Sequence, residues 1–130
     1  MDRIPAGTWV VVADGESARV FTNVGDERKV ALRQDDLLSQ EDLAAGGAGD
    51  LPQEQTIAEI GEAQFSRQLA HSINAAALKN MFEHIVLVAD PQSLGRMRPL
   101  LHKEVLARLV GELPKTLTRS RLEDIERALH

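Results

Sequence analysis

Asp14 and Asp90 each follow directly on an apolar run, Trp9–Ala13 and Ile85–Ala89. If these runs are neighbouring strands, the two carboxylates meet at one edge of a sheet, where they could hold a divalent metal ion that activates water. The alternative is structural, because Asp14 opens an Asp-Gly turn and Asp90 can cap a helix that begins at Pro91. The spacing selects no third acidic ligand, which favours the structural interpretation.

A second set of polar residues lies in a long helical stretch. Arg67, His71 and Asn74 fall on one side of it by the i, i+4, i+7 rule and could bind a small anion or a partner. A single His among polar helix residues is more often solvated or hydrogen-bonded. His84 and His102 have no partner at metal-ligand spacing, so we expect neither a metal site nor a cofactor. Signatures of a Ser-His-Asp triad, a phosphate loop or a dinucleotide site are also missing.

The charges are distributed unevenly along the chain. Residues 38–61 hold five acidic side chains and no basic one, whereas residues 91–121 hold seven basic side chains against two acidic ones. If they share a face, the basic residues of the last third could neutralise phosphates and bind RNA in a salt-dependent way. The candidates are Arg96, Arg98, Lys103, Lys115, Arg119 and Arg121. The alternatives are contact with a protein partner and an ordinary solvated surface, and the few aromatic residues argue against base stacking.

Length and composition are typical of one globular domain over residues 1–130. The chain has no cysteine, which excludes disulfides and thiolate chemistry. Its apolar runs are too short for a membrane helix, and the first residues lack the apolar stretch of a signal peptide. We therefore expect a cytoplasmic location and no membrane partner.

Strand patterns dominate the first third of the sequence. Residues 8–13, 18–23 and 28–34 predict three antiparallel strands, with Asp14-Gly15 supplying positive φ in the first turn. Residues 38–61 predict a long, mobile, acidic loop. Residues 62–83 then predict the main helix, in which Leu69 and Ile73 belong to the stripe that packs on the sheet. Its other side could be covered by the C-terminal segment or by another subunit.

The remaining sequence predicts a return to the sheet. Ile85–Ala89 is typical of a strand buried on both faces, and a helix kinked at Pro99 should follow it. Residues 106–113 favour a last strand, and Ser120 begins a capping box that opens a closing helix. The sequence thus predicts a single-domain α/β fold with a mixed sheet, in the order β-β-β-α-β-α-β-α.

This order resembles the ribonuclease H-like middle domain of archaeal and eukaryotic peptide-chain release factors and of Pelota. Several segments also resemble a bacterial offshoot, the host attachment family, or "protein required for attachment to host cells". These segments are residues 9–15, 18–21, 89–91, 94–98 and 111–118. The resemblance covers nearly the whole chain.

One motif departs from the release-factor pattern. The release factors carry Gly-Gly-Gln in their long loop, whereas this chain has Gly46, Gly47 and Ala48. The resemblance therefore implies that peptidyl-tRNA hydrolysis is absent. We expect a non-catalytic binding protein that contacts ribosome, tRNA or a protein partner through its basic last third, with an indirect role in attachment to host cells. The alternative is a metal-dependent hydrolase or nuclease that uses Asp14 and Asp90.

Overall fold

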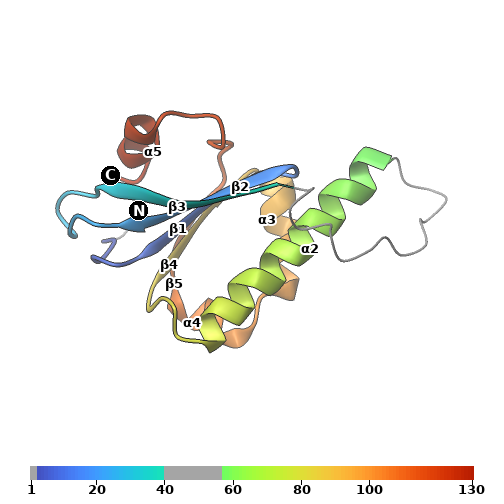
Figure 1. Cartoon of the computed structure of the whole chain (residues 1–130), viewed down its shortest axis with the longest axis horizontal. Coiled ribbons are helices and arrows are strands. Elements are labelled where there is room, and N and C mark those ends of the chain that lie inside the picture. The colour runs from blue at the N-terminus through green and yellow to red at the C-terminus, as the bar shows by residue number, and fades with distance from the viewer. Residues whose placement is uncertain (1–2, 40–56) are drawn as a thin grey trace.

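The computed structural model describes residues 3–39 and 57–130, which form a small α/β domain around one mixed sheet (Figure 1). The five strands lie in the order β3-β2-β1-β4-β5. Their bounds are β1 Trp9–Ala13, β2 Ser17–Asn23, β3 Leu32–Ser39, β4 Ile85–Ala89 and β5 Leu109–Leu113. The helices are α2 Ile57–Leu78, α3 Pro91–Met97, the 3-10 turn η2 Arg98–Leu100, α4 Lys103–Arg108 and α5 Leu122–Ala128.

The direction of the strands determines which residues meet at the ends of the sheet. β1, β2 and β3 pair antiparallel, whereas β1, β4 and β5 run parallel to one another. Ala13 and Ala89, the last residues of β1 and β4, are register partners. The chain therefore leaves β1, β4 and β5 at one common end of the sheet, which we call the carboxyl edge.

Side chains from both faces of the sheet form the core, because helices cover both faces. α2, α3 and α4 lie on one face, where Val11, Leu69 and Leu87 belong to one buried cluster. On the other face, Val12 and Ile125 belong to the second cluster, beneath α5. All five residues of β4 are buried, as expected for an interior parallel strand.

The predicted burial of the main helix is confirmed, but its predicted bounds are wrong. Leu69 and Ile73 are only 1% and 3% exposed. The helix begins at Ile57, and Gly61 does not interrupt it. It ends at Leu78 because Asn80 adopts a left-handed φ of 55°, which lets the Met81 N–H donate back to the Ala76 carbonyl.

Two other boundaries differ from the predictions for local reasons. The third strand starts at Leu32 instead of residue 28, because the Asp26 carboxylate accepts the N–H groups of Arg28 and Lys29 and holds them in a turn. The last strand starts at Leu109 instead of residue 106, because α4 runs to Arg108.

The helices after β4 also differ from the prediction. The expected kinked helix is divided into α3, η2 and α4. The capping box predicted at Ser120 is not formed, because Arg121 occupies the N-cap of α5 without a side-chain capping bond.

The bounds predicted for the acidic loop, residues 38–61, are wrong at both ends. Leu38 belongs to β3 and Gly61 belongs to α2, while residues 40–56 lie outside the described part of the chain. Among the described residues, no helix combines the length and the apolar character that crossing a bilayer requires.

Candidate functional site

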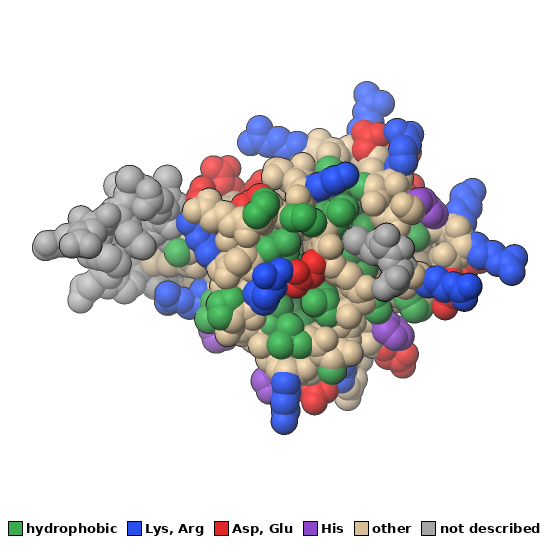
Figure 2. Space-filling model, turned by 180° about the vertical axis from the view of Figure 1, so that it is seen from behind, with side chains coloured by type: hydrophobic (Ala, Val, Ile, Leu, Met, Phe, Trp, Pro, Cys, Tyr) green, Lys and Arg blue, Asp and Glu red, His purple; other side chains and the backbone are tan. Residues whose placement is uncertain are grey.

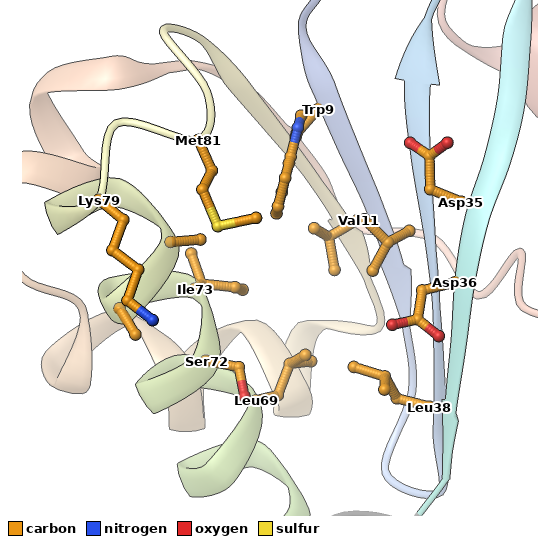
Figure 3. A pocket seen from close by; sticks show the side chains of 13 residues that line it. Trp9, Val11, Asp35, Asp36, Leu38, Leu69, Ser72, Ile73, Lys79 and Met81 are labelled. Carbon is orange, nitrogen blue, oxygen red and sulfur yellow. The ribbon is translucent and has the colours of Figure 1, made fainter.

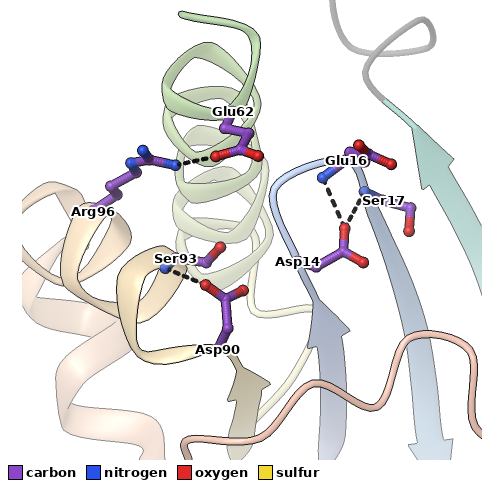
Figure 4. A network of polar contacts seen from close by, with 7 residues as sticks. All are labelled: Asp14, Glu16, Ser17, Glu62, Asp90, Ser93 and Arg96. Atoms are coloured by element: carbon purple, nitrogen blue, oxygen red, sulfur yellow. Dashed lines mark hydrogen bonds and ion pairs between the residues drawn. The ribbon is translucent and has the colours of Figure 1, made fainter. Parts of the chain in front are cut away.

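Asp14 and Asp90 both lie at the carboxyl edge, as the two strand ends predicted. Each follows one member of the Ala13 and Ala89 register pair, and both line a polar cavity of about 560 Å³. Figure 4 shows the two carboxylates at neighbouring strand ends, with Glu62 of α2 above them. Other residues that line the cavity include Ser93, Thr116, Thr118 and Arg119.

The Asp14 carboxylate is held by the protein itself. Its Oδ1 accepts the N–H groups of Glu16 at 2.7 Å and Ser17 at 2.8 Å, and its Oδ2 accepts the Thr118 hydroxyl at 2.6 Å. Burial raises the pKa of this carboxyl. The hydrogen bonds, led by that from Thr118, and the nearby charge of Arg119 together lower the pKa by more than burial raises it. The net pKa therefore lies below its ordinary value of 3.8, and Asp14 is a charged anchor for the chain around it.

Asp90 performs the predicted capping role. Its Oδ2 accepts the Ser93 N–H at 3.0 Å and so satisfies the first turn of α3. Its Oδ1 is buried without a hydrogen-bond partner in the described structure. Nowhere in residues 3–39 and 57–130 do three or more His, Asp or Glu side chains form a group that could hold a metal ion.

Glu62 connects the cavity to two helices and to the first turn. It pairs with Arg96 of α3 at 3.1 Å. It also lies so close to Gly15 that a Cβ there would be 2.5 Å from the Glu62 Cγ. Gly15 does not have the positive φ that its turn sequence predicted. The glycine is needed because any side chain would displace Glu62.

The segment that follows β5, residues 114–121, is fixed to the carboxyl edge. We call it the carboxyl-edge segment. Thr118 is buried and donates to Asp14, while Arg19 Nη1 donates to the carbonyl oxygens of Ser120 at 2.6 Å and Thr118 at 3.3 Å. Three basic side chains of the segment are exposed and form no ion pair with the described residues: Lys115, Arg119 and Arg121.

The other three basic candidates lie elsewhere or are already paired. Arg96 pairs with Glu62, and Arg98 pairs with Glu112. Lys103 opens α4, which leads into Leu109 beside Ile85, so it belongs to the opposite end of β5. On the face of the molecule that Figure 2 shows, the Lys and Arg side chains are scattered and do not gather in one patch.

Arg67, His71 and Asn74 lie on α2, but the side chain of Asn74 forms hydrogen bonds within the fold. Its Nδ2 donates to the Leu100 carbonyl at 2.9 Å, and its Oδ1 accepts the His102 N–H at 2.8 Å. These bonds fasten the link between η2 and α4 to the main helix. Arg67 and His71 remain exposed side chains beside it.

Sequence reasoning missed Thr118 and Arg19, the two residues that anchor the carboxyl-edge segment. Arg19 lies between Ala18 and Val20 in an ordinary strand pattern, and Thr118 lies in a polar stretch, 104 positions from its partner. No local signal identifies either contact. Gly46, Gly47 and Ala48 fall outside the described residues.

Comparison with known proteins places the chain in a family. The model of bacterial archaeo-eukaryotic release factor family 12 matches residues 7–129. No curated protein matches the chain. The match supports the release-factor-like part of the resemblance and gives no support to host attachment. Because the match covers nearly the whole chain, the protein belongs to bacterial archaeo-eukaryotic release factor family 12.

Proposed function

We propose that this protein is a non-catalytic, ribosome-related binding module that contacts RNA phosphates through its carboxyl-edge segment. The observation that carries the proposal is the combination of anchoring and exposure in that segment. The Thr118 hydroxyl donates to Asp14, and the Ser120 carbonyl accepts from Arg19. The exposed side chains of Lys115, Arg119 and Arg121 form no ion pair within the described residues. Membership of a release-factor family is consistent with a role at the ribosome.

Anchoring favours binding because it lowers the cost of ordering the segment. A flexible loop loses conformational freedom when it binds, whereas a segment held by hydrogen bonds has already lost most of it. Each phosphate that a basic side chain neutralises releases a counterion, which makes RNA binding favourable at low salt. We therefore place the contact at residues 114–121 instead of across the whole basic third.

Two features support the absence of catalysis. The chain has Ala48 where release factors carry the glutamine of Gly-Gly-Gln. The alternative function, a metal-dependent hydrolase or nuclease, would need Asp14 as a ligand. Oδ1 of Asp14 already accepts two hydrogen bonds and Oδ2 accepts one, which leaves one lone pair of Oδ2 for a metal ion.

Three further parts of the proposal rest on the sequence. The order of strands and helices supports the ribonuclease H-like fold of release-factor middle domains. A cytoplasmic location follows from the proposed ribosomal partner. An indirect role in attachment to host cells rests on the resemblance of short segments alone, and it would act through translation.

Co-sedimentation with purified ribosomes tests the proposal. The test variant replaces Lys115, Arg119 and Arg121 by Ala. The control replaces Arg3, Arg28 and Lys29, three exposed basic residues, by Ala. Arg28 and Lys29 lie in the turn between β2 and β3, away from the carboxyl edge, and both variants lose the same charge. We expect the wild type and the control to sediment with ribosomes and the test variant to stay in the supernatant.

Failure of the wild type to sediment at low salt would contradict ribosome binding. An equal loss of ribosome binding in both variants would mean that the net charge of the protein, and not the carboxyl-edge segment, determines binding.

A further inference from the structure

A second cavity, of about 480 Å³, lies between α2 and the face that β1, β2 and β3 present to it. Figure 3 shows its two walls, with Trp9 and Leu38 on the strands and Leu69 and Ile73 on the helix. Most of the lining is apolar. This volume is within the range of small-molecule sites in proteins.

Small residues on one side of α2 keep this cavity open. Ser72, Ala75 and Ala76 line it and project little into the space. α2 packs against three helical elements, α3, η2 and α4, all of which follow β4 in the chain. No helix in the described structure fills the space beside Leu38, which is only half-buried.

An irregularity in β3 turns two carboxylates toward this cavity. Val20 pairs with Asp36 and Phe21 pairs with Gln34, so Asp35 has no register partner on the neighbouring strand β2. The extra residue is a β-bulge, which re-aims side chains locally. In a regular strand Asp35 and Asp36 would point to opposite faces, whereas here both line the cavity (Figure 3).

The two carboxylates differ in what they already bind. Asp35 accepts hydrogen bonds from the Thr22 hydroxyl and from Arg33 Nε, and the bond from Thr22 is the largest cause of its lowered pKa. Asp36 accepts only the Leu37 N–H, through Oδ1. Its Oδ2 has no hydrogen bond within the described structure. Asp36 therefore offers a charged acceptor beside an apolar surface. The lining also includes one basic residue, Lys79.

We propose that this cavity binds a small organic cation with an apolar body. The cationic nitrogen would bind Asp36, and the apolar body would lie against Trp9 and Leu69. A charge-assisted hydrogen bond to Asp36 favours such a ligand over a neutral or anionic one, and the apolar lining favours its apolar body. The proposal is independent of RNA binding, because it uses a different cavity from that at the carboxyl edge.

Fluorescence offers a direct test, because Trp9 is the only tryptophan of the chain and lines the cavity. Dansylcadaverine, a primary amine on an apolar aromatic body, is titrated against the full chain, and energy transfer from Trp9 to the dansyl group is followed. An uncharged dansyl amide of similar size and the anion anilinonaphthalene sulfonate serve as matched probes. We expect the amine to bind about three- to tenfold tighter than the neutral probe, and the anion to bind weakest.

Two pairs of variants locate the binding. Asp36→Asn should remove most of the preference for the amine, whereas the control Glu123→Gln, an exposed acid on α5, should keep it. Ser72→Leu should fill the cavity and weaken both the amine and the neutral probe. The control His71→Leu adds the same side chain at an exposed position outside the cavity lining. Circular dichroism confirms that each variant is folded.

Four outcomes would overturn the proposal. They are no energy transfer with any probe, equal affinity for amine and neutral probe, tighter binding of the anion, and a preference for the amine that survives Asp36→Asn.

Discussion

The hydroxyl of Thr118 donates a 2.6 Å hydrogen bond to Asp14 Oδ2, joining two residues that are 104 positions apart. This contact ties the segment after the last strand to the end of the first strand. With the bonds from Arg19 to the Ser120 and Thr118 carbonyls, it fixes the backbone from which Lys115, Arg119 and Arg121 project.

Replacing Thr118 by Val tests this anchor. The substitution keeps the shape of the side chain but removes the donor, so the buried side of the Asp14 carboxylate loses a partner. We expect the free energy of unfolding to fall by about 1 to 3 kcal/mol, measured by urea denaturation at pH 7. The control Thr116→Val, at an exposed position of the same segment, should change it by less than about 0.5 kcal/mol. Equal losses in the two variants would contradict an anchoring role for Thr118.

The lowered pKa of Asp14 predicts how this stability depends on pH. A carboxyl group whose pKa is lower in the folded state stabilises the fold above its unfolded pKa, and this contribution is lost as the pH falls through the folded pKa. The difference in unfolding free energy between wild type and Asp14→Asn should be constant from pH 6 to 8. It should shrink as the pH falls below about 4, close to the ordinary value of 3.8. Urea denaturation at several pH values measures this difference, and a gap that widens toward pH 3 would show that the sign is wrong.

Truncating Leu69 to Ala tests the packing of α2 on the sheet. Leu69 is 1% exposed, so the truncation leaves a cavity, and we expect a loss of about 2 to 5 kcal/mol in the free energy of unfolding. Leu78 lies on the same helix but is 58% exposed, and its truncation should cost far less. Chemical denaturation compares the two variants. Similar losses would mean that α2 does not pack as described.

Local signals in the sequence predicted some features well. β1 and β4 are short apolar runs bounded by turn residues, and their pattern alone defines them. The role of Asp90 followed from the Asp-Pro pair, because capping depends on neighbours within one turn. The location of Asp14 and Asp90 at one edge of the sheet also followed from the sequence, since parallel strands bring their carboxyl ends to one edge.

Other features depend on contacts between distant residues, or on geometry that composition does not reveal. Glu112 neutralises the charge of Arg98, one of the predicted basic residues, and only the fold brings these two residues together. The bulge at Asp35 leaves the composition of the strand unchanged, so the sequence gives no sign that Asp35 and Asp36 share a face. The left-handed Asn80 ended α2 earlier than helix propensity predicted.

Peptidyl-tRNA hydrolysis should be undetectable in the wild type, because Ala48 replaces the glutamine of Gly-Gly-Gln. Ala48→Gln should not create it, since Asp42 and Asp50 are close in sequence and would still oppose access to an RNA-lined site. Release of labelled peptide from peptidyl-tRNA on ribosomes measures the activity, with an active release factor as positive control. Release by the unaltered protein would overturn the non-catalytic assignment.

The most direct test of the central claim is the salt dependence of tRNA binding. Labelled tRNA is titrated at several salt concentrations against the wild type, the variant lacking Lys115, Arg119 and Arg121, and the control lacking Arg3, Arg28 and Lys29. Each phosphate contact contributes a slope of about −0.7 to −0.9 in log K against log salt. If all three side chains contact phosphate, the first variant should bind with a slope that is flatter by about two to three, while the control keeps the wild-type slope. No binding at low salt, or identical slopes for all three proteins, would contradict RNA recognition by the carboxyl-edge segment.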